Sequence, residues 1–100
     1  MRFNHVGVIS EITTMPGCSQ ICIFHNVFVK PEARNKGIGS HAHYERLCEA
    51  RALGYQMALC TVISSNIAQK KILSKAGWKY HQFFNSEKTE NPVELWSILL

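Results

Sequence analysis

Hydrophobic and polar residues alternate along the first part of the chain in a way that predicts strands. Residues 3–12 alternate roughly with a period of two and are rich in Val and Ile, which predicts a strand. Residues 13–19, with Pro16-Gly17 at their centre, predict a turn. Residues 21–29 are almost continuously apolar, as in a strand buried on both faces, and the two strands are expected to form a hairpin.

Two polar residues, His25 and Asn26, interrupt this apolar run at its middle. Polar residues inside a buried strand indicate a β-bulge, where pairing fails and a backbone or side-chain group becomes available. Pro31 then ends the run.

The next segment changes to a helical period and predicts a helix that Gly54 ends. The apolar residues expected on its buried face are Ile38, Ala42, Leu47, Ala50 and Leu53.

The remaining third of the chain predicts a strand over 55–63, a helix over 67–76 and two final strands over 78–84 and 93–100. Ser64-Ser65-Asn66 supplies N-cap candidates for the helix, and Gly77 is expected to close it.

We predict the segment order β-β-β-α-β-α-β-β, in which the chain before Ile21 has room for two strands and no helix. A strand-helix-strand-helix succession implies parallel pairing at the centre of the sheet. We predict an α/β fold, with a mixed sheet that has antiparallel strands at its margins and helices on its faces, as one domain over residues 1–100.

Composition narrows the class of protein. The chain has 100 residues, 46% of them hydrophobic and 18% charged, which suits a folded core. No apolar run exceeds four residues, far short of the ~20 that span a bilayer, and the N-terminus does not resemble a secretory signal. A cytoplasmic location with reduced thiols is expected. Of the four cysteines only Cys18 and Cys22 are close in sequence, so we expect no metal site.

The formal charge of +4 favours an anionic partner. One segment of the chain combines several features of an anion-binding site. Residues 27–40 form a strand that leads into a basic, glycine-rich turn at the start of a helix. Glycines allow close approach of the backbone, free N–H groups at the helix start point outward, and Arg34 and Lys36 add charge. The spacing is neither that of a Walker loop nor that of a dinucleotide fingerprint.

Within this segment, Arg34-Asn35-Lys36-Gly37-Ile38-Gly39 fits the pattern Arg/Gln-x-x-Gly-x-Gly/Ala, and Val-x-Pro-x-x-Arg precedes it. In both features the segment resembles the GNAT family of N-acetyltransferases. A second motif, Asn66 followed by Lys75-Ala76-Gly77-Trp78, is similar to the family's Asn…Lys-x-Gly-Phe segment. The two motifs lie within residues 21–78.

The resemblance implies a GNAT-like acyl-CoA N-acyltransferase fold, shortened at its N-terminus, that binds acetyl-CoA where the family's fourth and fifth strands diverge. Backbone amides of residues 36–40 would hold the pyrophosphate, and main-chain groups of Phe28 and Val29 would face the pantetheine arm and the acetyl carbonyl. The expected binding residues are Phe28, Val29, Arg34, Asn35, Lys36, Gly37, Ile38, Gly39, Ser40 and Asn66.

His25 stands where many members have a Glu that accepts the proton of the attacking amine. A neutral imidazole can do the same as a general base. The alternative is a histidine that merely satisfies its own hydrogen bonds within the strand.

The chain departs from the family in two ways. Leu73 stands where many members place a Tyr that protonates the leaving thiolate; Ser74, Tyr80 and Cys60 are weaker substitutes. The short segment before Ile21 leaves no room for the two helices that usually wall the acceptor site, so a homodimer is expected to complete it.

Other polar and aromatic residues have plainer interpretations. His41 and His43 are two apart on a helix and are expected to be solvated. The basic run Lys70, Lys71, Lys75 and Lys79 is expected to be a solvated face, with contact to the 3′-phosphate of coenzyme A as the alternative. Core packing is expected for four aromatic residues, Trp78, Trp96, Phe83 and Phe84.

The predicted function is transfer of an acetyl group from acetyl-CoA to a primary amine by direct attack, with His25 as the base. The alternative is a non-catalytic acyl-CoA binder, which Leu73 and the short N-terminal segment favour. A small basic nucleic-acid-binding domain is a third and less favoured class, and no membrane partner is expected.

Overall fold

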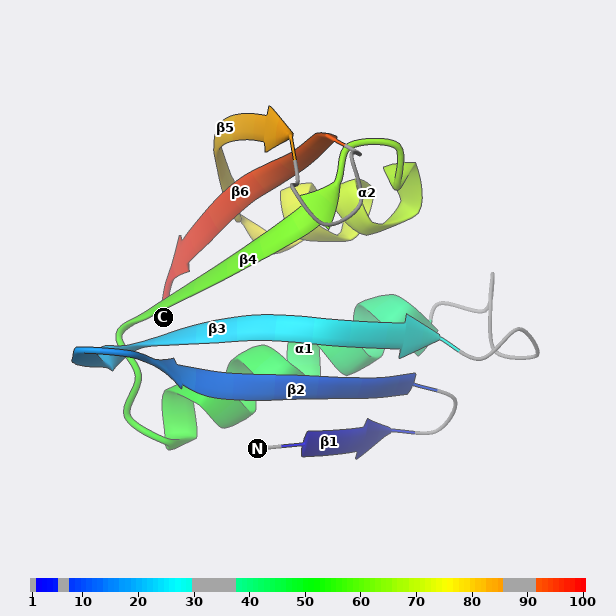
Figure 1. Cartoon of the computed structure of the whole chain (residues 1–100). Coiled ribbons are helices and arrows are strands. Elements are labelled where there is room, and N and C mark those ends of the chain that lie inside the picture. The colour runs from blue at the N-terminus through cyan, green and yellow to red at the C-terminus, as the bar shows by residue number, and fades with distance from the viewer. Residues whose placement is uncertain (1, 6–7, 30–37, 86–91) are drawn as a thin grey trace.

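Six strands and two helices make up the part of the chain that the computed structural model describes, residues 2–5, 8–29, 38–85 and 92–100, with side chains described for 11–25, 40–85 and 92–100. They are β1 (Arg2–His5), β2 (Val8–Met15), β3 (Cys18–Val29), α1 (Ile38–Ala52), β4 (Met57–Ile63), α2 (Ile67–Ala76), β5 (Lys79–Asn85) and β6 (Pro92–Leu99). The predicted order β-β-β-α-β-α-β-β is confirmed (Figure 1).

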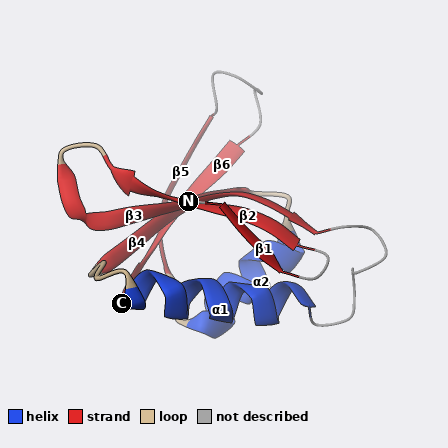
Figure 2. Cartoon of the chain, turned by 90° about the horizontal axis from the view of Figure 1, so that it is seen from below, coloured by secondary structure: helices blue, strands red, loops and turns tan. Residues whose placement is uncertain are grey.

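The strands form one sheet in the order β1-β2-β3-β4-β6-β5. Among the described strands, only the central pair β3–β4 is parallel, and the other neighbouring pairs are antiparallel, as predicted. Both helices lie on one face of the sheet, not on its two faces as the sequence suggested (Figure 2). In Figure 1, α1 lies behind β2 and β3, and α2 lies behind β4 and β6.

The core lies between this face and the two helices. Phe24 and Cys22 of β3 and Leu73 of α2 are its most deeply buried large side chains. The core cluster as a whole comprises Ile12, Cys22, Phe24, Leu47, Ala50, Ala58, Cys60, Val62, Leu73, Trp78 and Trp96.

The turn between β2 and β3 is shorter than the predicted 13–19. It consists of Pro16-Gly17, with Gly17 at φ 79°, a conformation that glycine adopts without a Cβ penalty. Thr13 and Thr14 extend β2 instead, because β-branched residues fit a pleated strand.

Helix α2 begins and ends where the sequence predicts. The Asn66 side-chain oxygen accepts the backbone N–H of Gln69 at 3.2 Å and so caps the helix. Gly77 adopts the left-handed conformation at φ 95°, and its N–H bonds the carbonyl oxygens of Leu73 and Ser74.

Helix α1 differs from its prediction. Its buried residues are His43, Arg46, Leu47 and Ala50, whereas Leu53 lies beyond the last turn and is exposed. The expectation that His43 is solvated was wrong, while that for His41 is confirmed.

The core assignment of Phe83 and Phe84 was also wrong, because β5 is an edge strand and both rings are exposed. Trp78 and Trp96 are buried as predicted. Neither of the described helices is long and apolar enough to cross a membrane.

Candidate active site

The parallel pair β3–β4 separates halfway along its length. Its register runs from Ile21 opposite Met57 to Phe24 opposite Cys60 and then stops. β3 continues to Val29, and β4 continues to Ile63 while remaining paired with β6. Beyond the last pair the two strands therefore diverge, and Figure 1 shows the angle between them.

A β-bulge in β3 begins at the same point. Glu11 of β2 lies opposite His25, and Ile9 lies opposite Phe28, so a step of two residues on β2 matches a step of three on β3. One extra residue therefore lies in the Asn26-Val27 segment, which confirms the bulge that the sequence predicts. Backbone groups that the ladder does not use are thus concentrated where β3 leaves β4.

His25 is the last residue before the bulge, and its side chain contacts β2. A hydrogen bond of 3.1 Å joins its Nε2 to Oγ1 of Thr13, and Oε2 of Glu11 lies 3.9 Å from the same nitrogen. The His25 side chain is 36% exposed, so a ligand can reach it.

Glu11, Thr13 and His25 share one face of the sheet. Glu11 pairs with His25, and Thr13 pairs with Ile23, which lies two residues before His25 on β3. It is the face opposite α1, since Phe24 packs on α1 and successive side chains alternate. Glu11 and Thr13 cannot be recognised as site residues from the sequence alone. Their alternation with Ile12 places them on the polar side of β2, but only the hairpin register shows that His25 is their neighbour.

The other predicted binding residues are placed only in part. The backbones of Phe28 and Val29 lie beyond the bulge, opposite Ile9 and Val8. Ile38 and Gly39 begin α1, and Ser40 is exposed in its first turn. Arg34, Asn35, Lys36 and Gly37 lie outside the described residues.

The carboxyl ends of β3 and β4 and the N-termini of α1 and α2 lie at the same edge of the molecule (Figure 1). Helix N-termini carry a partial positive charge and favour anions. Asn66 is at this edge, but its side-chain oxygen is used to cap α2. The arrangement combines unpaired strand backbone with two positive helix ends, which suits an elongated anionic molecule with an amide-containing arm.

The family model of the acetyltransferase (GNAT) family matches residues 4–78. The chain belongs to the GNAT acetyltransferase family. This confirms the resemblance on which the sequence interpretation was based, and the bulge and the strand divergence lie within the matched segment. No curated protein sequence matches the chain.

Solved structures show that the fold is that of GNAT acetyltransferases. An IAA acetyltransferase from Bacillus cereus superimposes with a TM-score of 0.83 at 13% identity, covering 93% of this chain and 69% of that one. A Bacillus subtilis acetyltransferase in complex with CoA has a TM-score of 0.79 at 15% identity, covering 94% and 69%. A putative phosphinothricin N-acetyltransferase has a TM-score of 0.82 at 18% identity, covering 94% and 63%.

This GNAT chain does not place a hydroxyl at the position of the family's usual acid. Leu73 is completely buried in the core. Of the three substitutes, Tyr80 lies on β5, separated from β4 by β6, and Ser74 is exposed on α2. Cys60 does lie at the last parallel pair, but burial raises the pKa of its thiol to about 12, the nearby Arg46 opposing this shift. Such a thiol is a poor proton donor.

A buried polar cluster supports the divergent strands from the helix side. Nε1 of Trp78 donates to Nε2 of His43 at 2.8 Å, and both rings contact Phe24. The Arg46 guanidinium stacks 4.2 Å from the centroid of the Phe24 ring. Among the described residues, no three His, Cys, Asp or Glu side chains are arranged to hold a metal ion.

Proposed function

We propose that this GNAT protein transfers an acetyl group from acetyl-CoA to a primary amine by direct attack. The observation that carries the proposal is the coincidence of three features at one point of β3: the end of pairing with β4, the bulge, and His25. The family supplies the acyl-transfer chemistry. One solved relative of the same fold is a complex with CoA.

The unpaired backbone of β3 fits the acyl-CoA end that this proposal requires. An acyl pantetheine arm carries amide groups that can bond to strand backbone in place of the missing β4 partner. Free N–H groups at the bulge can also donate to the carbonyl oxygen as negative charge develops on it, which stabilises the transition state. Phe28 and Val29 remain the proposed residues for these main-chain contacts.

His25 is the proposed general base. In the tautomer whose Nε2–H donates to Thr13, Nδ1 carries the lone pair that accepts a proton from the incoming amine. The Glu11 carboxylate, 3.9 Å from Nε2, then offsets the charge of the imidazolium.

The reaction balances without another reactant. The amine nitrogen forms a bond to the carbonyl carbon, the C–S bond breaks, and one amine proton passes to His25. The thiolate leaves and is protonated by water or the imidazolium, giving an amide and the free thiol. A thiol is a fair leaving group, so turnover without a dedicated acid is expected to be slow but real.

A second candidate function is acyl-CoA binding without catalysis. The buried Leu73 favours it, because the side chain can neither donate a proton nor reach a ligand. Both candidates require binding of the same molecule and differ only in turnover.

The test combines calorimetric binding of acetyl-CoA with thiol release over a panel of small amines, peptides and lysine derivatives. His25→Gln is expected to leave the dissociation constant unchanged and to lower kcat by roughly 10²-fold or more. His41→Gln, which alters an exposed histidine on α1, is the matched control and is expected to match the unaltered protein.

Each result decides between the candidates. Binding without thiol release for any amine would leave the acyl-CoA binder as the function. Full activity in His25→Gln would remove His25 as the base while retaining the transferase. Absence of binding at millimolar acetyl-CoA would refute both.

A further inference from the structure

A second concave surface lies on α2, away from the candidate active site. This groove, of about 560 Å³, runs between α2 and the outer strands β5 and β6. Its volume is within the range of small-molecule sites, ~300 to 1,000 Å³. The residues that line it are Ile67, Lys70, Lys71, Ser74, Lys75, Tyr80, Glu94 and Trp96.

The groove is separate from the site around His25. On α2, Ile67, Lys71 and Ser74 recur at helical spacing and form one stripe of the helix surface. Leu73 belongs to a different stripe and points into the core. On the sheet side, the groove is lined from β5 and β6, and β6 separates β5 from β4. Binding of a ligand in this groove is therefore independent of the proposed acetyl transfer.

The apolar part of the groove is aromatic and partly open to solvent. The rings of Tyr80 and Trp96 meet edge to face, with centroids 5.8 Å apart. Tyr80 is 44% exposed and Ile67 is 55% exposed. An aromatic ligand that covers these groups removes apolar surface from water and adds a third ring to an existing pair.

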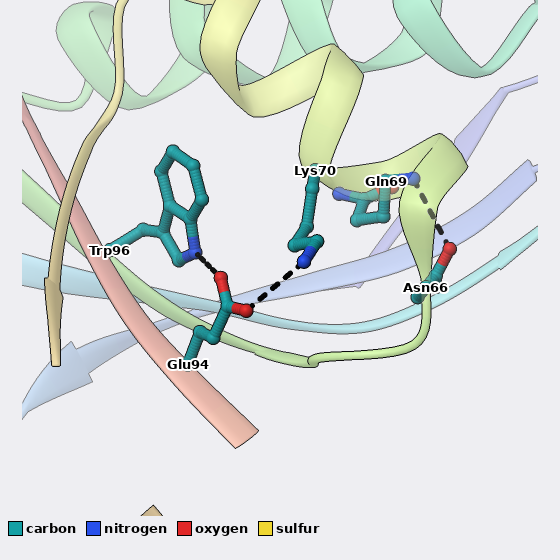
Figure 3. A network of polar contacts seen from close by, with 5 residues as sticks. All are labelled: Asn66, Gln69, Lys70, Glu94 and Trp96. Atoms are coloured by element: carbon teal, nitrogen blue, oxygen red, sulfur yellow. Dashed lines mark hydrogen bonds and ion pairs between the residues drawn. The ribbon is translucent and has the colours of Figure 1, made fainter. Parts of the chain in front are cut away.

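The polar groups at the base of the groove already satisfy one another. Lys70 Nζ lies 3.1 Å from Oε2 of Glu94, and Nε1 of Trp96 donates to Oε1 of the same carboxylate at 3.1 Å (Figure 3). Figure 3 shows both Glu94 oxygens directed at these two donors, so Glu94 is not free to bind a ligand cation.

The rim, in contrast, carries free positive charge. Lys71 and Lys75 are one helical turn apart, both are exposed, and neither forms an ion pair with a carboxylate among the described residues. An aromatic floor below two ammonium groups is complementary to a flat apolar body with one negative charge.

We propose that this groove binds a small aromatic carboxylate. The ring covers Tyr80, Trp96 and Ile67, and the carboxylate lies between the ammonium groups of Lys71 and Lys75. The lysines give the groove its preference for an acid over the corresponding neutral amide.

The two tryptophans provide a direct test by ¹⁵N–¹H correlation spectroscopy. Trp96 lines the groove, whereas the Trp78 indole is buried against His43 and serves as an internal reference. The probes are 2-naphthoate and the neutral 2-naphthamide, and the two indole signals are distinguished in a Trp96→Phe variant. Naphthoate is expected to shift the Trp96 signal saturably, to leave Trp78 unmoved and to bind several-fold more tightly than naphthamide.

The charge contribution is tested by Lys71→Gln with Lys75→Gln in one chain. The double variant is expected to weaken naphthoate binding about fivefold, since exposed charges contribute modestly, and to leave naphthamide binding unchanged. The matched control is Arg51→Gln with Lys79→Gln, which removes two exposed cations that do not line the groove. It is expected to bind both probes as the unaltered chain does.

Five results would overturn the proposal. They are equal shifts at Trp78 and Trp96, equal affinity for acid and amide, and no saturation at several millimolar probe. The fourth is displacement of naphthoate by coenzyme A, which would make the groove part of the coenzyme's own site. A Trp96 signal that moves on dilution without probe would instead identify a second copy of the chain as the occupant, and would equally reject the carboxylate.

Discussion

The indole Nε1–H of Trp78 donates to Nε2 of His43 across 35 residues of sequence, at 2.8 Å and out of contact with water. Nε2 must therefore carry the lone pair, so His43 is neutral with its proton on Nδ1. Burial, and next the charge of Arg46, lower the pKa of His43 to about 4. The bond fixes α1 to the segment that follows α2, beneath Phe24 of β3.

Acid is expected to destabilise the fold through His43. The folded-state pKa of His43 is about 4 and its ordinary value is 6.5, so the unfolded chain binds the proton more readily. Stability from this group is complete above pH 6.5 and is lost as pH falls toward 4. The difference in pKa corresponds to about 3 kcal/mol in the free energy of unfolding.

Urea unfolding at pH 7 and pH 4.5 measures this effect. In His43→Gln, whose amide accepts the indole N–H but does not titrate, the stability difference between the two pH values should shrink by about 2 kcal/mol. His41→Gln alters an exposed histidine and should keep the full difference. An unchanged difference in His43→Gln would show that His43 does not titrate in this range.

Arg46 is expected to destabilise the core rather than to stabilise it. The side chain is 5% exposed, and its Nε and Nη1 have no hydrogen-bond partner within the described structure. Burial lowers the pKa of the guanidinium to about 10, although the thiols of Cys60 and Cys22 act in the opposite direction. A buried cation with two unsatisfied nitrogen atoms costs more than an apolar side chain of similar volume.

Arg46→Met should therefore raise the free energy of unfolding by about 1 kcal/mol, after allowing for the lost contact with the Phe24 ring. Arg51→Met, at an exposed position of the same helix, should change it by less than about 0.5 kcal/mol. A loss of more than about 2 kcal/mol in Arg46→Met would mean that the guanidinium has a stabilising partner.

Restoring the family's usual tyrosine is expected to fail. Leu73 is completely buried, so the larger ring of Leu73→Tyr has no space and its hydroxyl has no water. Overpacking should lower the free energy of unfolding by about 1 to 3 kcal/mol, measured by thermal or urea unfolding. Thiol release should not increase. Leu73→Met keeps the volume and serves as the control; a faster Leu73→Tyr variant would show that the position faces the reacting thiol after all.

The ion pair between Lys70 and Glu94 joins α2 to β6 and is expected to stabilise the fold. The Glu94 side chain is 12% exposed, and burial alone would raise its pKa. Hydrogen bonds from Lys70, Trp96 and Ser64, with the charge of Lys70, outweigh burial and hold the pKa of Glu94 below its ordinary value. Stability from Glu94 is therefore present at neutral pH and lost as the carboxylate is protonated.

A double-mutant cycle with Lys70→Met and Glu94→Gln should give a coupling energy of about 1 kcal/mol in urea unfolding at pH 7. The same cycle with Lys71→Met in place of Lys70→Met should give no coupling, because Lys71 does not reach Glu94. Equal coupling for the two lysines would indicate general charge attraction instead of a specific pair.

Local sequence was sufficient to predict the bulge and the caps. His25 and Asn26 stand out because polar residues interrupt an apolar strand, and the register places the extra residue beside them. Asn66 and Gly77 are recognisable because capping depends on residues within one helical turn. These features need no knowledge of distant contacts.

Features that depend on distant contacts were not predictable. His43 and Arg46 look solvated in a helix sequence, and only Trp78 and Phe24, from other elements, explain their burial. Phe83 and Phe84 look like core residues, but β5 is placed at the sheet edge by the strand order. The partners of His25 depend on the hairpin register, which a one-residue change of turn length would alter.

The four parallel residue pairs from Ile21–Met57 to Phe24–Cys60 are the ladder by which two three-stranded ribbons, β1-β2-β3 and β4-β6-β5, join within the described structure. Beyond Phe24 no backbone pairing between β3 and β4 holds the angle between these two ribbons. A molecule that bonds to both β3 and β4 there would replace the missing pairing and tie the two ribbons together. The amides of β4 beyond Cys60 should then exchange more slowly with solvent deuterium, reporting occupancy by a change in motion alone.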